Sequence, residues 1–368
     1  RTEYSSASLT NSLLGNCSSP LLGANSMEQV FQSFLSEGHW SVLVSVLLGS
    51  LLILGKAADW LVSAAVDLSQ RSNIPKVLIG ATIVSLGTTT PEVAVSVSAA
   101  IRGQAGFALG NAVGSIICNI GLILGFVCLL DPPRLDHKIV NRQNTIQWVA
   151  SILLVLSCLP WPSAENAFSH GGRVSQFIAI AFLLALATYI WQSVRWTRER
   201  AVANGKADTA EKASIWIISI KLTGALALVV VAARILLPTV TEAAVRLGVS
   251  EIVIAATLVA FGTSLPELVV ATTAALRGYG ELAVGNVIGA NILNVLFVVG
   301  AAGAVTPTGL IATPHFFLVL FPTMLLLLLT LRIGISNSVD NLSRPYGVVM
   351  LTIYVLYTII NYTMVGNN

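Results

Sequence analysis

Two glutamates lie in the middle of long apolar stretches, each directly after a proline. Glu92 ends the stretch Ser85-Leu-Gly-Thr-Thr-Thr-Pro-Glu92, and Glu267 ends its near copy Ala260-Phe-Gly-Thr-Ser-Leu-Pro-Glu267. A charged side chain in the middle of a bilayer-spanning helix costs at least about 2.5–3.5 kcal/mol, so it is expected to face the protein interior and to have a partner. Two carboxylates facing each other across a dry site repel unless a cation lies between them. The pair therefore predicts a cation site.

Oxygen ligands of other kinds accompany both glutamates. A proline removes one backbone donor and clashes with the carbonyl four residues earlier, so carbonyls in the ranges 87–89 and 262–264 should leave the helical hydrogen-bond ladder. The same turns carry the hydroxyls of Thr88, Thr89, Thr263 and Ser264. Carboxylates, carbonyls and hydroxyls together form a hard, all-oxygen cage of the kind that Ca²⁺ prefers and Na⁺ also accepts. Metals that prefer Cys or His find neither here.

A second pair of motifs repeats at the same offset of 175 residues that separates the two glutamates. Gly110-Asn-Ala-Val-Gly-Ser-Ile-Ile-Cys-Asn119 aligns without a gap with Gly285-Asn-Val-Ile-Gly-Ala-Asn-Ile-Leu-Asn294. Glycines spaced four apart let membrane helices approach closely. The amide oxygens of Asn119 and Asn294 could complete the cage. Ser115 could add a hydroxyl, although its counterpart is Ala290, so the site is not fully symmetric.

Several of these features have a purely structural explanation when taken alone. A lone proline in a membrane helix is as often an ordinary kink, but two matched copies that each precede a glutamate favour a site. Asn111 and Asn286 fit a ligand role or an interhelical hydrogen bond equally well. The charged residues inside other apolar segments are better explained by snorkelling or local pairing than by a substrate role: these are Lys56, Asp59, Lys221 and Arg234.

The composition excludes most other classes of protein. Of the residues, 55% are hydrophobic and 10% charged, whereas soluble domains carry about 25% charged residues. The chain is therefore expected to be an integral membrane protein whose main partner is the lipid bilayer. A net charge of +3 gives no reason to expect nucleic acid. The sequence offers no nucleophile–base pair, nucleotide-binding loop or Cys/His metal pattern, so we expect neither an enzyme nor a cofactor.

Ten apolar segments, each near the roughly 20 residues needed to cross a bilayer, follow one another at 42–66, 77–101, 107–130, 145–162, 174–196, 214–240, 251–276, 282–305, 312–332 and 345–364. The offset pairs the first five with the last five. Because each half has an odd number of segments, the halves cross the membrane in opposite directions. The predicted fold is all-α, with ten transmembrane helices in two inverted five-helix repeats.

The same reading divides the chain into four parts. A polar N-terminal tail, disordered or loosely docked, comes first, and a charged linker separates the repeats. The predicted bounds are 1–41 for the tail, 42–196 for the first repeat with its motif at 85–119, 197–213 for the linker, and 214–368 for the second repeat with its motif at 260–294.

The distribution of positive charge predicts the orientation in the membrane. Most lysines and arginines lie in the connections that follow odd-numbered segments, whereas the opposite side carries Arg1, Arg102, Arg173 and Arg246. Lysine and arginine favour the cytoplasmic side. Both termini are therefore expected to be non-cytoplasmic and the linker cytoplasmic.

The two motif pairs resemble the alpha repeats of the cation/calcium exchanger superfamily, whose best-known members are sodium/calcium exchangers. The likeness lies in G-T-[ST]-x-P-E and G-N-x-x-G-[SA]-x-x-x-N and covers residues 42–364. It implies a central site on helices 2, 3, 7 and 8, with Glu92 and Glu267 as shared calcium and sodium ligands. It also implies oxygen ligands at Thr88, Thr89, Ser115, Thr263 and Ser264.

One departure bears on the number of ions bound. Sodium/calcium exchangers often carry Asp where this chain has Asn294, and often Ser where it has Ala290. The site thus holds two formal negative charges, Glu92 and Glu267, which balance one calcium or two sodium ions. The Gly-Asn-x-x-Glu pattern of the proton/calcium branch is absent, which argues against that branch without excluding proton coupling.

The predicted function is secondary-active exchange of sodium for calcium by alternating access at one central site. A proton-coupled or potassium-dependent calcium exchanger is the alternative, and a cation channel is a remote one. Channels usually place their filter on an axis shared by several subunits, whereas an inverted repeat within one chain suits alternating access.

Overall fold

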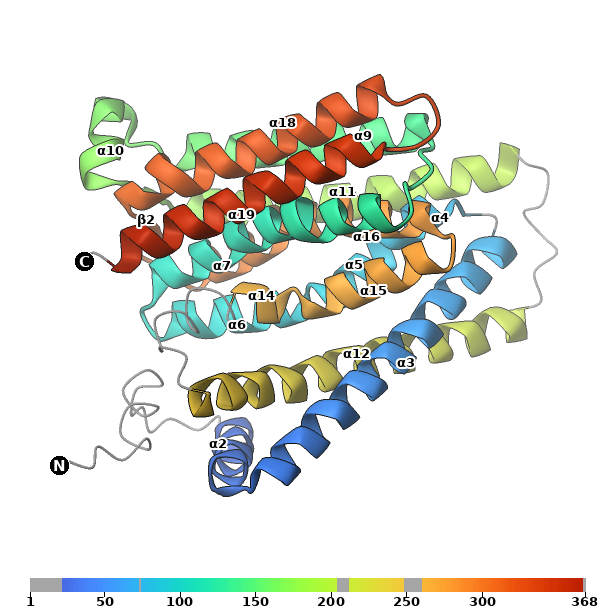
Figure 1. Cartoon of the computed structure of the whole chain (residues 1–368). Coiled ribbons are helices and arrows are strands. Elements are labelled where there is room, and N and C mark those ends of the chain that lie inside the picture. The colour runs from blue at the N-terminus through green and yellow to red at the C-terminus, as the bar shows by residue number, and fades with distance from the viewer. Residues whose placement is uncertain (1–21, 73, 204–211, 248–259, 367–368) are drawn as a thin grey trace.

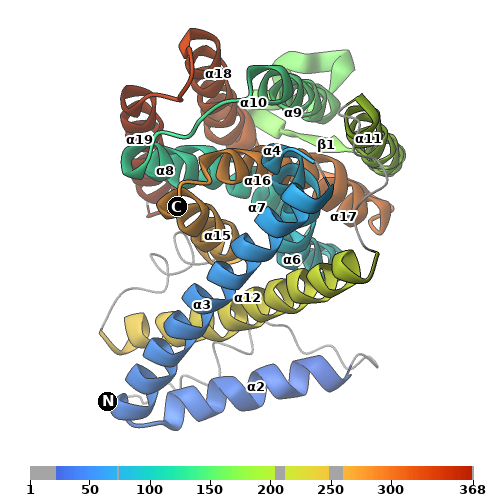
Figure 2. The ribbon, with the colours of Figure 1, turned by 90° about the vertical axis from the view of Figure 1, so that its right-hand side faces the viewer.

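The computed structural model of the chain describes residues 22–72, 74–203, 212–247 and 260–366. Long helices lie side by side, most of them running in a common direction, with two strongly tilted helices, α3 and α12, along one side (Figures 1 and 2). The chain's first half supplies, in order, α2 (Leu22–Glu37), α3 (Trp40–Ser72), α4 (Lys76–Ile79), η1 (Gly80–Val84), α5 (Ser85–Thr88), α6 (Thr90–Ile101), α7 (Ala105–Cys118), η2 (Asn119–Leu124), α8 (Gly125–Leu130), α9 (His137–Cys158), η3 (Trp161–Asn166), α10 (Ala167–His170), β1 (Gly172–Val174) and α11 (Gln176–Ala203).

The second half repeats this order of helices after the linker. It supplies α12 (Lys212–Arg246), α14 (Ala260–Thr263), α15 (Leu265–Leu276), α16 (Gly280–Leu293), η5 (Asn294–Val299), α17 (Gly300–Ala304), β2 (Leu310–Ala312), η6 (Phe316–Leu320), α18 (Phe321–Asn337) and α19 (Arg344–Gly366). The only strands among the described residues are β1 and β2, which pair antiparallel with Gly172 opposite Ala312. The all-helical prediction therefore holds, with one short ladder added between two loops.

Length and composition make the chain a multi-pass membrane protein. Among the described residues, six helical segments are long and apolar enough to cross a bilayer, and the bent pair Lys76–Thr88 and Thr90–Ile101 makes a seventh. Helices α9 and α19 occupy the places of the fourth and tenth predicted spans. The seventh predicted span is represented by α14 and α15, and its first part, 251–259, lies outside the described residues.

Some predicted bounds are wrong. The fourth span was expected at 145–162, but α9 runs from His137 to Cys158. Its start is fixed by Asp136, whose Oδ1 accepts a hydrogen bond from the Ile139 amide at 3.2 Å, the N-cap role that Asp favours. Apolar composition does not mark the start of α9, because the first turns of this helix are polar. The predicted linker 197–213 is shorter as well, since α11 continues to Ala203 and α12 begins at Lys212.

The expected disordered or loosely docked tail, 1–41, is also corrected in part. Residues 22–37 form helix α2, and α3 begins at Trp40. Residues 1–21 lie outside the described part of the chain. The Ser and Asn content of the stretch predicts a polar tail, although its apolar residues recur at helical spacing.

The core of the bundle is formed by α7 and α16, which are largely enclosed by other helices. Gly285 and Gly289 of α16 lie directly against α4 and η1: a Cβ at Gly285 would come within 2.9 Å of Val77 Cα in α4, and one at Gly289 within 2.5 Å of Ala81 Cα in η1. The counterpart of Gly285 differs, because a Cβ at Gly110 would meet Phe316 Cζ at an ordinary 3.7 Å. The close approach predicted for the glycine motifs is therefore seen at these positions of the second copy and not at Gly110.

Candidate cation-binding site

Both glutamates follow a break in their helix. Helix α5 ends before Thr89 (φ −79°, ψ −6°), and α6 begins with Thr90 and Pro91, so that the two parts are bent by 42°. The second half repeats the break at Ser264 (φ −88°, ψ 8°), between α14 and α15. Proline is tolerated in the first turn of a helix and ends the preceding one. Each carboxylate thus sits in the first turn of a new helix, where the helix dipole favours negative charge.

Each glutamate is held by a hydroxyl from the opposite half of the chain. Thr89 Oγ1 donates to Glu267 Oε1 at 3.3 Å, and Ser264 Oγ donates to Glu92 Oε1 at 3.5 Å. All four side chains are buried, with exposed fractions of 0–1%. The two bonds exchange under the 175-residue offset, so the pseudo-symmetry seen in the sequence is repeated in these contacts.

A second pair of contacts obeys the same symmetry. Thr88 Oγ1 lies 3.5 Å from Asn286 Oδ1, and Thr263 Oγ1 lies 3.3 Å from Asn111 Oδ1. In these contacts the threonine hydroxyls donate to amides across the repeat boundary. Asn111 and Asn286 therefore make the interhelical hydrogen bond that was one of their two predicted roles.

Buried oxygens without a hydrogen-bond partner gather among the predicted site residues. Among the described site residues they are Glu92 Oε2, Glu267 Oε2, Ser115 Oγ, Asn119 Oδ1 and Asn294 Oδ1, and others, such as Gln147 Oε1 and Thr272 Oγ1, lie outside the predicted site. Leaving a buried polar group unsatisfied costs about 1–3 kcal/mol. A hard cation would satisfy these oxygens together, because carboxylate, amide and hydroxyl oxygens are its usual ligands.

The two asparagines that end the second motif each begin a π-helical segment. Asn119 opens η2 and Asn294 opens η5, at equivalent places in the two halves. Single π turns inside α-helices are frequent at functional sites. Neither segment was predicted, since no residue type marks a π turn as proline marks a break.

The symmetry fails at Asn119. Its Nδ2 donates to Asn291 Oδ1 at 3.0 Å, and its Oδ1 has no partner in the described part of the protein. The equivalent of Asn291 in the first half is Ile116, so Asn294 lacks such a support. Asn291 is not among the predicted site residues, although an asparagine inside the motif was a visible signal.

Ser96 was missed as well. Its Oγ accepts a hydrogen bond from Asn111 Nδ2 at 3.0 Å, and its counterpart is Ala271, which leaves Asn286 Nδ2 without a partner among the described residues. The Nδ2 of Asn291 likewise has no hydrogen-bond partner among the described residues. These amide nitrogens are donors and cannot bind a cation, so water is their chemical match.

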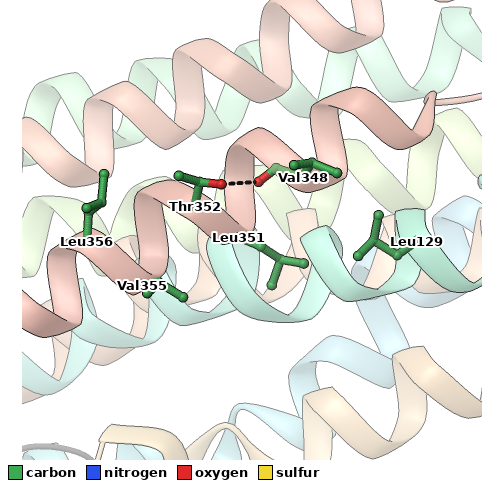
Figure 3. Close-up of a pocket in the computed structure, with 6 residues that line it drawn as sticks. All are labelled: Leu129, Val348, Leu351, Thr352, Val355 and Leu356. Carbon is green, nitrogen blue, oxygen red and sulfur yellow. Dashed lines mark hydrogen bonds between the residues drawn. The ribbon is translucent and has the colours of Figure 1, made fainter.

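The chemistry of the site is that of a carboxylate pair surrounded by neutral oxygens. No group of three or more His, Cys, Asp or Glu that could hold a metal is found among the described residues. A pocket elsewhere, between α8 and α19, is lined by Leu129, Val348, Leu351, Thr352, Val355 and Leu356 (Figure 3). Its one hydroxyl, on Thr352, already donates to the Val348 carbonyl at 2.8 Å, so this pocket offers no cation chemistry.

The fold defines a multi-pass integral membrane protein with two related halves and buried carboxylates between them. Residues 42–195 and 219–363 match the family described as sodium/calcium exchanger protein. The chain belongs to the sodium/calcium exchanger family and is a transporter, not an enzyme.

Individual relatives agree with this assignment over nearly their whole length. The chain is 30% identical over 346 residues to the sodium/calcium exchanger MaX1 of Methanosarcina acetivorans, covering 86% of this chain and 97% of MaX1. It is 31% identical over 320 residues to the putative antiporter CaxA of Alkalimonas amylolytica, covering 85% and 96%. A solved structure of the sodium–calcium exchanger NCX_Mj superimposes with a TM-score of 0.70 at 28% identity, covering 86% of this chain and 98% of that one.

Proposed function

We propose that the protein exchanges sodium for calcium by alternating access, with Glu92 and Glu267 as ligands shared by both ions. Asn119, Asn294, Ser115 and the hydroxyls or carbonyls of Thr88, Thr89, Thr263 and Ser264 complete the proposed cage. The relatives described as sodium/calcium exchangers support sodium as the coupling ion, and NCX_Mj was examined with Na⁺, Ca²⁺ and Sr²⁺.

The observation that supports the proposal is that each half of the chain donates a hydrogen bond to the glutamate of the other half. One carboxylate oxygen of each glutamate accepts a hydrogen bond from a hydroxyl of the other half, and the second oxygen has no partner in the described chain. The remaining carboxylate oxygens lie on residues that are 1% exposed, and further oxygens without a partner in the described chain are on Ser115 of α7, on Asn119 of η2 and on Asn294 of η5. Such a set of oxygen acceptors fits a cation and has no match for an anion.

Obligatory exchange follows from the same electrostatics. With no ion bound, two buried carboxylates remain uncompensated, and an unpaired buried charge is strongly unfavourable. The carrier therefore reorients with one calcium or with sodium bound, and not empty. Ions on the two sides are exchanged instead of leaking.

The orientation is part of the proposal and rests on the distribution of Lys and Arg. We place both termini on the non-cytoplasmic side and the linker between α11 and α12 in the cytoplasm. The two repeats are then residues 42–196 and 214–368, inverted with respect to each other.

The test is uptake of radioactive calcium into proteoliposomes loaded with sodium and diluted into sodium-free buffer. Wild-type protein should take up calcium only when the sodium gradient is present. Glu92→Gln and Glu267→Gln should each abolish at least 90% of that uptake, roughly the loss expected when one of two charged ligands is removed. Glu281→Gln makes the same chemical change in the first turn of α16, outside the cage, and should leave uptake unchanged.

Other outcomes separate the alternatives. Calcium uptake that ignores sodium and follows a pH gradient would replace sodium by protons as the coupling ion. Uptake that also requires potassium would indicate potassium-dependent exchange. Calcium flux that persists without any opposing ion gradient would contradict exchange and favour a channel.

A further inference from the structure

Helix α2 lies crosswise at one end of the bundle. Figure 1 views it end-on while α12, α18 and α19 run across the picture, and Figure 2 shows it lying across the view. It lies at the end of the bundle where α3 begins and α12 finishes. Residues 22–37 precede the region that matches the family, so this helix is a feature of the chain itself.

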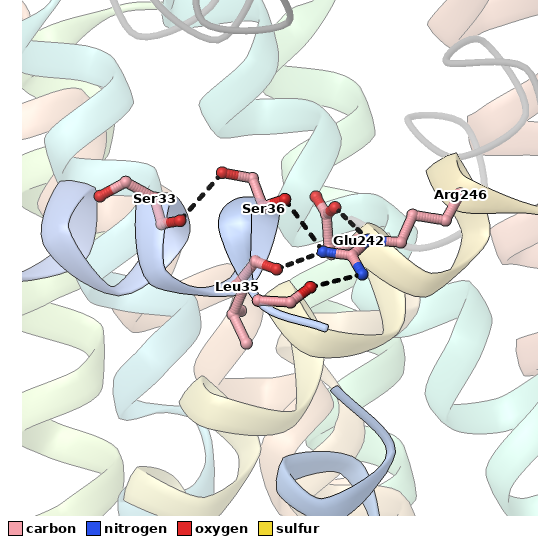
Figure 4. Close-up of polar contacts among 6 residues, drawn as sticks. Ser33, Leu35, Ser36, Glu242 and Arg246 are labelled. Atoms are coloured by element: carbon pink, nitrogen blue, oxygen red, sulfur yellow. Dashed lines mark hydrogen bonds and ion pairs between the residues drawn. The ribbon is translucent and has the colours of Figure 1, made fainter. Parts of the chain in front are cut away.

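Arg246, at the end of α12, links α2 to the bundle by hydrogen bonds (Figure 4). Its guanidinium donates to the carbonyl of Gly38 at 2.8 Å, to that of Ser36 at 3.1 Å and to that of Leu35. Glu242, one turn earlier on α12, accepts from Arg246 Nε at 2.8 Å and holds the side chain in place. The last carbonyls of a helix lack partners within it and carry partial negative charge, so Arg246 caps α2 from outside.

The described part of α2 has an apolar side that the protein covers only in part. Leu35 is 2% exposed and packs inward, whereas Val30 and Phe34, one turn apart, are 66% and 54% exposed. The polar side carries the exposed residues Ser33 and Ser36, and Glu37 lies at its edge, one turn after Phe34. A helix with this division is typical of one lying in a membrane interface, with its apolar side in the acyl boundary.

The lipid-facing surface of α3 continues directly from α2. Trp40, Val44, Leu48 and Leu52 recur every four residues along α3 and are 43–75% exposed. This stripe begins at Trp40, and tryptophan is enriched where the hydrocarbon meets the headgroups. Val30 and Phe34 therefore lie next to the point where the bilayer surface meets the protein.

We propose that α2 lies in the membrane–water interface, with Val30 and Phe34 inserted among the upper acyl chains and Ser33 and Ser36 in water. The occupant of its exposed apolar side is the bilayer itself. Through Arg246, the end of α12 is then attached to the membrane surface by a helix that the matched family region lacks. The inference depends on the membrane-spanning fold and is independent of which cation is exchanged.

The test is spin labelling of single cysteines in the full-length protein in lipid vesicles. The background carries Cys17→Ser, so that a label attaches at the chosen position, and the same background without an added cysteine measures labelling of the buried Cys118, Cys128 and Cys158. Labels are placed with Val30→Cys and Phe34→Cys, and with Ser33→Cys and Ser36→Cys as matched controls on the polar side of the helix. These positions are exposed, so the variants should fold, which calcium transport verifies.

At Val30→Cys and Phe34→Cys, collisions with oxygen, which concentrates in lipid, should exceed collisions with a water-soluble nickel complex. The order should reverse at Ser33→Cys and Ser36→Cys. Adding Arg246→Gln should increase the mobility of the Phe34→Cys label, while Lys221→Gln, on the same helix α12, should not. Equal nickel access at all four positions would place α2 in water and overturn the proposal. A label at Phe34→Cys reached by neither reagent would overturn it in favour of a protein partner.

Discussion

The carboxylates of the candidate site are positioned by neutral hydroxyls, and not by positive charges. Glu92 and Glu267 receive a hydroxyl hydrogen bond from Ser264 and Thr89, each from the other half of the chain. A hydroxyl fixes one carboxylate oxygen and leaves the negative charge available to a cation. A lysine or arginine in the same place would compete with calcium.

We expect Thr89→Val to raise the KM for calcium by about 10- to 100-fold, because hydrogen bonds to charged groups contribute about 1.5–3 kcal/mol. Thr89→Ser keeps the hydroxyl and should stay within about threefold of wild type, the residual effect being lost methyl packing. Initial rates of sodium-driven calcium uptake at a series of calcium concentrations measure both. A normal KM for Thr89→Val would mean that the Thr89–Glu267 bond does not position the ligand.

At the scale of residues, the sequence predicts site residues that occur in both halves more readily than site residues that occur in only one half. Glu92, Glu267, Asn119 and Asn294 stand out because each has an identical partner 175 residues away. Asn291 does not, since its counterpart is isoleucine. Its contact with Asn119 depends on how α16 packs against η2, which no spacing along the chain discloses.

At the scale of elements, the helix breaks and the helix contacts have different origins. Pro91 and Pro266 fix the breaks by local chemistry, and the sequence predicts both correctly. The contacts of the glycine motifs depend on which helix lies opposite. In the sequence Gly110 and Gly285 are equivalent, yet only Gly285 of the two lies against backbone, at Val77.

This difference predicts unequal effects of one methyl group. Gly285→Ala places its Cβ within 2.9 Å of Val77 Cα, so backbone must move, and overpacking of this kind costs about 1–3 kcal/mol. Gly110→Ala places its Cβ in ordinary contact with Phe316 and should be nearly neutral. Thermal unfolding in detergent should show a Tm lowered by several degrees for Gly285→Ala alone. Equal shifts for both variants would contradict the packing described for α16 and α4.

At the scale of the whole molecule, the two halves are related in sequence, but equivalent helices make different contacts. Helix α3 packs along α15, and Arg277, just after α15, lies 2.6 Å from Asp59 Oδ1 and 2.5 Å from Ser63 Oγ, both on α3. Their counterparts, α12 and α6, have no comparable packing among the described residues. Arg102, the equivalent of Arg277, bonds instead to Ser98 of its own helix, at 2.6 Å.

The counterpart of Asp59 is Arg234, so the symmetric arrangement would bring Arg234 and Arg102 together. Two arginines repel, whereas Asp59 and Arg277 attract. The Asp59–Arg277 ion pair therefore joins α3 to the end of α15, and the described residues hold no equivalent ion pair between α12 and the end of α6. The duplication in the sequence predicts two similar halves, but these contacts between helices differ because Asp59 and its counterpart Arg234 carry opposite charges.

We expect the Asp59–Arg277 ion pair to favour the orientation closed at the Arg277 face, which we place in the cytoplasm, so that Asp59→Asn should populate the orientation open there. Partly exposed ion pairs contribute about 0.2–1 kcal/mol, and both side chains are about one third exposed. The apparent KM for calcium at that face should therefore fall by up to about fivefold, because the competent state becomes more populated. Lys56→Gln removes the other cation near Asp59, at 3.7 Å on the same helix, and should leave this KM unchanged. Calcium uptake by inside-out vesicles measures both variants, and an identical effect of the two would assign the change to the charge of α3 instead of its contact with Arg277.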